Sequence, residues 1–71
     1  MVVTTQVRMA NEIAAQFRHL PREAAITALA EHLLSFWDPR MRDQLLAAAD
    51  QHDPTMDDLV VAAATRLRRL I

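Results

Sequence analysis

Apolar residues recur every three to four positions along most of this 71-residue chain. That period is typical of amphipathic α-helices, and the alternating valine- and isoleucine-rich runs that indicate strands are missing. Three prolines, Pro21, Pro39 and Pro54, divide the pattern into four segments. Because proline suits the first turn of a helix and disrupts its interior, each proline predicts a helix start. We therefore expect an all-α fold, a small compact unit of four short helices, orthogonal or bundle-like, with no sheet.

The expected helices span about 5–20, 21–37, 39–50 and 54–70 within one helical domain over residues 1–71. Asp38 and Asp53 directly precede prolines, and aspartate is a favourable N-cap. We expect these two residues to cap the third and fourth helices. Residues 55–58, TMDD, offer a capping box as an alternative start of the last helix.

The chain is short for a domain that is stable alone. Domains below about 70–80 residues usually gain stability from disulfides, a metal or a partner, and this chain has no cysteine. The apolar stripe of the second helix, which includes Leu34, Phe36 and Trp37, covers about half of the helix circumference. An arc that wide is expected to touch more than one neighbour, so we expect a partner protein.

No catalytic, cofactor-binding or metal site is expected in this chain. Without glycine it cannot form a glycine-rich phosphate loop, and without cysteine it offers no thiolate ligands to an iron–sulfur cluster. His19, His32 and His52 lie on three segments and lack the spacing of a zinc motif. Ser35 lies outside any Gly-x-Ser-x-Gly turn. We therefore expect the chain to be no enzyme by itself.

Charge and hydropathy give no sign of a nucleic acid or membrane partner. The net charge is −1, and the eight arginines are interspersed among nine acids, so no extended positive field faces a phosphate backbone. The chain has no apolar run long enough to span a membrane and no signal peptide pattern. A cytoplasmic location is the expectation.

Residues 35–42, SFWDPRMR, place the only tryptophan beside a proline and two arginines. Trp37 is interpreted either as the packing centre where two helices meet or as a partner contact. Arg40 and Arg42 point about 160° apart on one helix, so one is expected to stay local, near Asp38 or Asp43, while the other reaches outward.

Two more polar residues border apolar stripes. His32 is expected to be half-buried at the margin of the second helix. Asn11 borders the stripe of the first helix, where its amide either bonds to a neighbouring segment or is solvated.

Three segments together resemble a known family. They are residues 7–14 (VRMANEIA), residues 32–42 (HLLSFWDPRMR) and residues 59–61 (LVV). In order and spacing they resemble the small delta subunit of soluble NAD-dependent formate dehydrogenases. The FWDPRMR segment is the most specific part of the resemblance.

The resemblance implies a cytoplasmic, multisubunit oxidoreductase that converts formate and NAD to carbon dioxide and NADH. It implies that a catalytic alpha subunit holds a molybdenum or tungsten bis-pterin cofactor and iron–sulfur clusters, with FMN and further clusters in the beta and gamma subunits. It also implies that the delta chain binds none of these cofactors.

On this basis we expect a non-catalytic accessory subunit that docks on the catalytic alpha subunit, either to stabilise it or to aid its assembly and cofactor loading. The candidate partner-binding residues are Arg8, Asn11, His32, Trp37, Arg40 and Arg42. A helical DNA-binding regulator that uses the second and third helices as a helix-turn-helix is the alternative.

Overall fold

The computed structural model describes residues 5–71, which form four α-helices and, within that range, no strand. The helices are α1 (Thr5–Phe17), α2 (Arg22–Phe36), α3 (Pro39–Asp50) and α4 (Asp58–Leu70). The predicted all-α fold is confirmed.

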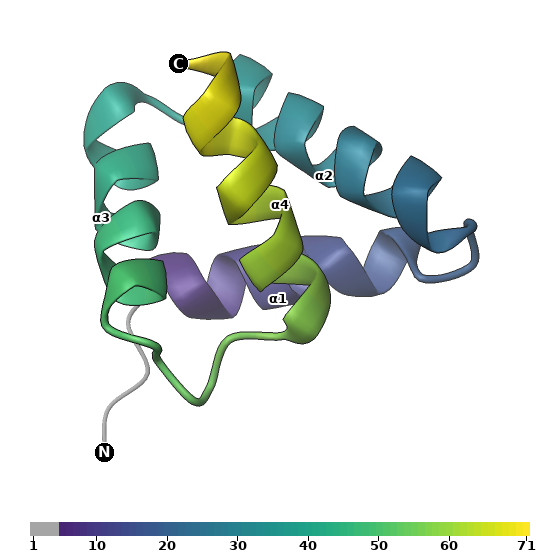
Figure 1. Cartoon of the computed structure of the whole chain (residues 1–71), viewed down its shortest axis with the longest axis horizontal. Helices are drawn as coiled ribbons and strands as arrows, with labels where there is room; N and C mark the ends of the chain where they lie inside the picture. Colours follow the sequence, from purple (N-terminus) through teal and green to yellow (C-terminus); the bar gives the residue numbers. More distant parts are fainter. Residues whose placement is uncertain (1–4) are drawn as a thin grey trace.

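The helices cross one another instead of running side by side as a parallel bundle. Figure 1 shows α1 lying along one side, α3 rising steeply from one of its ends, and α2 and α4 converging toward their C-terminal ends. The most extensive packing is between α2 and α4, and α1 contacts each of the other three helices. The fold is therefore of the orthogonal kind.

The core contains only apolar side chains among the described residues. Its largest fully buried members are Leu29, Leu33, Leu45, Leu67, Val7 and Val60. Alanines on all four helices, among them Ala10, Ala30, Ala48 and Ala63, let the helix backbones approach closely. A core of this composition stabilises the fold through burial of apolar surface.

The first helix ends three residues before the predicted boundary at Leu20. Residues 18–20 form a turn in which the Leu20 amide donates to the Phe17 carbonyl at 3.0 Å. Proline disfavours the α conformation in the residue before it, so Pro21 requires the helix to end earlier. Pro21 itself precedes α2 as its N-cap, and its carbonyl accepts from Ala25 at 2.9 Å.

The start of α3 follows the prediction. The Asp38 side chain accepts a hydrogen bond from the Met41 amide at 2.9 Å, and Pro39 is the first helical residue. Trp37 and Asp38 have extended backbone conformations, which separates α2 from α3 within two residues.

The prediction that Asp53 and Pro54 open the last helix is wrong. The Asp53 carboxylate instead accepts from the amide and hydroxyl of Thr55, at 2.8 and 2.6 Å, and closes a local turn. Asp57 caps α4 by accepting from the Leu59 amide at 2.8 Å, so the helix begins at Asp58. Residues 53–57 therefore form a connection instead of a first helical turn.

Candidate functional site

Two adjacent aromatic residues at the corner between α2 and α3 have different environments. Trp37 lies in the core with an exposed fraction of 6%, whereas the Phe36 side chain is 75% exposed. Trp37 thus has the packing role that one of its two interpretations gave it. Its contact with a partner stays a prediction.

Phe36 belongs to a row of three rings that joins α1 to α2. The His32 ring lies 4.8 Å from the Phe36 ring and 6.5 Å from the Phe17 ring, which it meets edge to face. These centroid separations are typical of favourable ring pairs. His32 is half-buried, as predicted.

The two arginines of the corner differ as their spacing predicts. Arg42 stays local, but it donates from Nη1 to the Leu34 carbonyl at 3.3 Å instead of pairing with Asp38 or Asp43. Its Nε is buried without a hydrogen-bond partner. Arg40 is exposed and has no polar partner among the described residues.

Asn11 has partners within the chain on both sides of its amide group. Its Nδ2 donates to the Thr55 carbonyl at 2.9 Å, and its Oδ1 accepts from the Asp57 amide at 2.9 Å. Asn11 therefore attaches the connection between α3 and α4 to α1. Arg8 is exposed, with no ion pair or hydrogen bond to the described residues.

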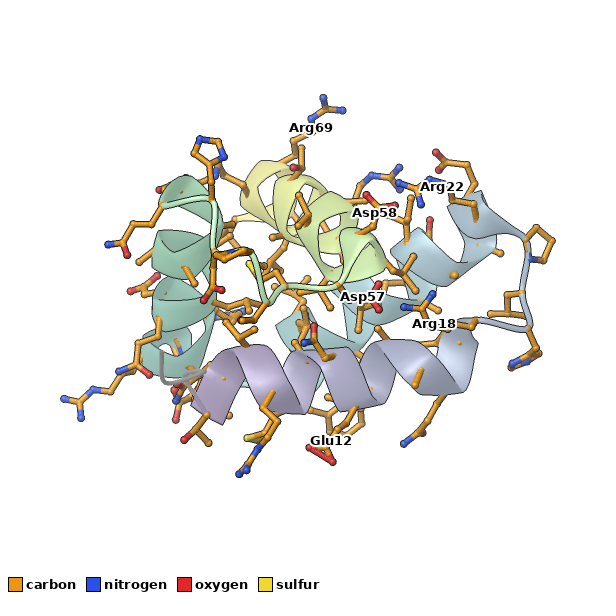
Figure 2. All side chains as sticks on the ribbon, turned by 90° about the horizontal axis from the view of Figure 1, so that it is seen from below. Glu12, Arg18, Arg22, Asp57, Asp58 and Arg69 are labelled. Carbon is orange, nitrogen blue, oxygen red and sulfur yellow. The ribbon has the colours of Figure 1, made fainter. Side chains whose placement is uncertain are left out.

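Four of the eight arginines form ion pairs within the chain. The pairs are Arg18–Asp57, Arg22–Asp58, Arg66–Glu23 and Arg68–Asp50. Figure 2 shows the first two pairs side by side at the start of α4, and shows Glu12 and Arg69 pointing away from the body of the molecule. The remaining arginines, Arg8, Arg40, Arg42 and Arg69, have no carboxylate partner among the described residues.

A surface hollow of about 190 Å³ lies beside the two ion pairs at the start of α4. Its lining includes Arg18, Arg22, Asp57 and Asp58, and these charges neutralise one another. A second hollow of about 350 Å³ between α1 and α3 is lined by Gln6, Gln44, Ala47, Ala48, Gln51 and Asp53, and the Asp53 carboxylate is bound to Thr55. Neither hollow combines an unpaired charge with a buried polar group, so neither has the features of a small-molecule site.

The described residues contain no cluster of three or more histidine or acidic side chains placed to hold a metal ion. None of the helices in this part of the chain has the length and apolarity needed to cross a bilayer. The arginines of α3 do not form a basic row, because Arg42 binds the Leu34 carbonyl and leaves Arg40 as the one arginine of this helix without a polar partner among the described residues. The structure therefore gives no support to the helix-turn-helix alternative.

The structure brings some of the sequence-predicted residues together and separates others. The His32 ring packs against the Phe36 ring, and Arg42 donates to the Leu34 carbonyl in the last turn of α2. His32 and Arg42 therefore lie at the α2–α3 corner, where Arg40 is also found. Asn11, on α1, lies apart from this corner and binds the connection before α4. Phe36 was not predicted as a contact residue because it was counted in the apolar stripe. The width of that stripe was the available signal, since residues at the edge of so wide an arc remain exposed.

Comparison with known protein families gives one finding. The sequence matches the family described as NADH-dependent formate dehydrogenase delta subunit FdsD over residues 6–64. No curated protein and no solved structure matches the chain.

Proposed function

Because the chain belongs to the family of NADH-dependent formate dehydrogenase delta subunits, we propose that it is a non-catalytic accessory subunit that docks on the catalytic alpha subunit. The observation that carries this proposal is the family match. The matched residues, 6–64, extend from α1 into α4 and include the whole α2–α3 corner. Docking stabilises the alpha subunit or keeps it in a form that accepts its cofactor.

The cofactors of the complex are proposed to be bound by other subunits. Molybdenum or tungsten bis-pterin and iron–sulfur clusters belong to the alpha subunit in this proposal, and FMN and further clusters belong to the beta and gamma subunits. The chain has no cysteine, and thiolates are the usual protein ligands of iron–sulfur clusters. This composition supports a position outside the electron path. The complex is proposed to be cytoplasmic because the family resemblance implies it.

The exposed apolar side chains support a docking role. Phe36, Leu70 and Ile71 are each between 50% and 75% exposed. Burial of such side chains in an interface contributes roughly 25 cal/mol for each Å² of apolar surface removed from water. Docking therefore stabilises the small chain as well as the large subunit.

The proposal can be tested by producing a tagged alpha subunit with and without this chain. The chain is expected to remain bound through affinity purification and size exclusion. The alpha subunit is expected to carry more cofactor, or to resist thermal unfolding better, when the chain is present. A chain that elutes free of the alpha subunit under all conditions, with no effect on either property, would contradict the proposal.

A further inference from the structure

Phe36 is the most exposed large hydrophobic residue that the structure describes, at 75%. Its ring nevertheless has a packing partner, because the His32 ring lies 4.8 Å away and itself contacts Phe17 from α1. A side chain that is ordered before binding loses little conformational entropy when it enters a partner's pocket. Phe36 therefore has the properties of an interface anchor.

Arg40 lies close enough to Phe36 to act in the same interface. Four residues of chain span at most about 14 Å, and a standard interface of about 800 Å² per partner is wider than that. Between them, Trp37 is buried and Asp38 caps α3, so the backbone of the corner is fixed. The corner therefore fixes the backbone positions of Phe36 and Arg40 relative to each other.

The charges of the corner indicate the chemistry of the partner. Arg40 and Arg42 have no carboxylate partner within the described chain, whereas Arg18, Arg22, Arg66 and Arg68 all have one. Of the two acids here, Asp38 is engaged with the Met41 amide and Asp43 is exposed. Both aspartates keep their negative charge, but neither forms an ion pair with Arg40 or Arg42, so a partner surface that carries carboxylates can supply the missing ion pairs.

Two further observations favour this corner over other exposed apolar positions. Residues 34–42 lie inside the segment that matches the family, while Leu70 and Ile71 lie beyond its end at residue 64, and Val61, inside it, is less exposed than Phe36 at 43%. A symmetric contact between two copies through one protruding ring also falls far short of the roughly 1,200 Å² that a stable interface buries. A larger partner that surrounds the ring is therefore favoured over a second copy.

We propose that the α2–α3 corner, with Phe36 as the anchor and Arg40 and Arg42 beside it, enters an apolar pocket bordered by carboxylates on the alpha subunit. This inference rests on the proposed function, because it names the surface through which that docking occurs.

The test is to measure the affinity of the full-length chain and its variants for the purified alpha subunit by biolayer interferometry. Phe36→Ala is expected to weaken binding at least tenfold, and Arg40→Glu is expected to weaken it more at low than at high ionic strength. The matched controls are Val61→Ala, an exposed apolar residue on α4, and Arg69→Glu, an unpaired arginine near the end of α4. Both controls are expected to bind within twofold of the unsubstituted chain.

The outcomes separate this inference from the proposed function. Tight binding by the unsubstituted chain that Phe36→Ala and Arg40→Glu leave unchanged would overturn the corner as the docking surface and leave the proposed function standing. No binding by the unsubstituted chain would overturn both. Dimerisation of the free chain that Phe36→Ala abolishes would assign the corner to a second copy and also overturn the inference. Circular dichroism melts of the variants show whether a weakened variant is folded.

Discussion

At the scale of single residues, two neighbouring aromatic side chains have opposite environments. Phe36 is the last residue of α2 and faces solvent, whereas Trp37 leaves the helix with an extended backbone and turns into the core. The sequence placed both residues in the apolar stripe of the second helix and singled out Trp37 alone as a packing centre or partner contact. Trp37 lies four residues after the buried Leu33, so its burial continues the apolar stripe. The exposure of Phe36 depends on how the neighbouring helices cross α2, and helical periodicity contains no information about that crossing.

Replacement of Trp37 by alanine is expected to affect folding directly. Trp37→Ala should reduce the free energy of unfolding by about 3 kcal/mol or more, because it removes a large buried side chain and leaves a cavity. Urea unfolding followed by circular dichroism measures the change. Phe36→Ala is the matched comparison, and should shift the free energy of unfolding by less than about 0.5 kcal/mol because its ring is mostly in water. Equal losses in the two variants would contradict the burial described for Trp37.

Asn11 provides a second prediction at this scale. Asn11→Ala should reduce the free energy of unfolding by about 1–3 kcal/mol, because the Thr55 carbonyl and the Asp57 amide each lose a partly buried hydrogen-bond partner. Thermal unfolding of the variant can be compared with that of Gln16→Ala, an exposed position on the same helix. If both variants unfold at the same temperature, the Asn11 bonds do not contribute to stability.

At the scale of helices, the predicted starts of α3 and α4 were correct or wrong according to which groups Asp38 and Asp53 bind. The same Asp-Pro pair precedes α3 and the connection before α4, yet only Asp38 caps a helix. Asp53 has a competing donor in Thr55, whose hydroxyl and amide it binds at 2.6 and 2.8 Å. The periodic pattern therefore predicted the existence of all four helices, while local side-chain competition determined where α4 begins.

The end of α3 carries strain that a substitution can remove. His52 has a φ of 56°, in the left-handed region, and its amide and that of Asp53 donate to the Ala49 and Ala48 carbonyls. This pattern is a Schellman motif, in which glycine is preferred at the left-handed position.

His52→Gly should therefore raise the free energy of unfolding by about 0.5–1 kcal/mol, because relief of the left-handed strain exceeds the added chain entropy of glycine. Chemical denaturation measures the change, and His19→Gly, in the turn after α1, is the comparison that should not stabilise. A loss of stability in His52→Gly would contradict the strained conformation.

The turn before α4 makes stability depend on pH. The hydrogen bonds from the hydroxyl and the amide of Thr55 hold the pKa of Asp53 below its ordinary value of 3.8. A carboxyl group with a lowered folded-state pKa stabilises the fold above its unfolded-state pKa, and this contribution is lost as the pH falls through the folded-state value.

The melting temperature of the unsubstituted chain should therefore exceed that of Asp53→Asn near neutral pH, and the difference should shrink only when the pH falls below 3.8. Melting temperatures of both proteins across the acid range provide the measurement. A difference that stays constant to the lowest pH would show that ionisation of Asp53 does not stabilise the turn.

At the scale of the whole molecule, the four helices bury Trp37 but leave a few other apolar side chains exposed at the surface. The sequence predicted that four short helices would leave apolar surface uncovered, and Phe36, Leu70 and Ile71 are at least half exposed. It could not predict which residues these would be, because exposure at a stripe edge depends on how α2 crosses α1 and α4. The ion pairs at the start of α4 also join segments far apart in the sequence, so spacing along the chain did not predict them.

The measurement that tests the central claim most directly is native mass spectrometry of the mature, active formate dehydrogenase complex. A permanent accessory subunit predicts one copy of this chain for each alpha subunit, retained in the fraction that reduces NAD. A fully active complex of stable composition that never contains the chain, from cells that also produce it, would contradict the account.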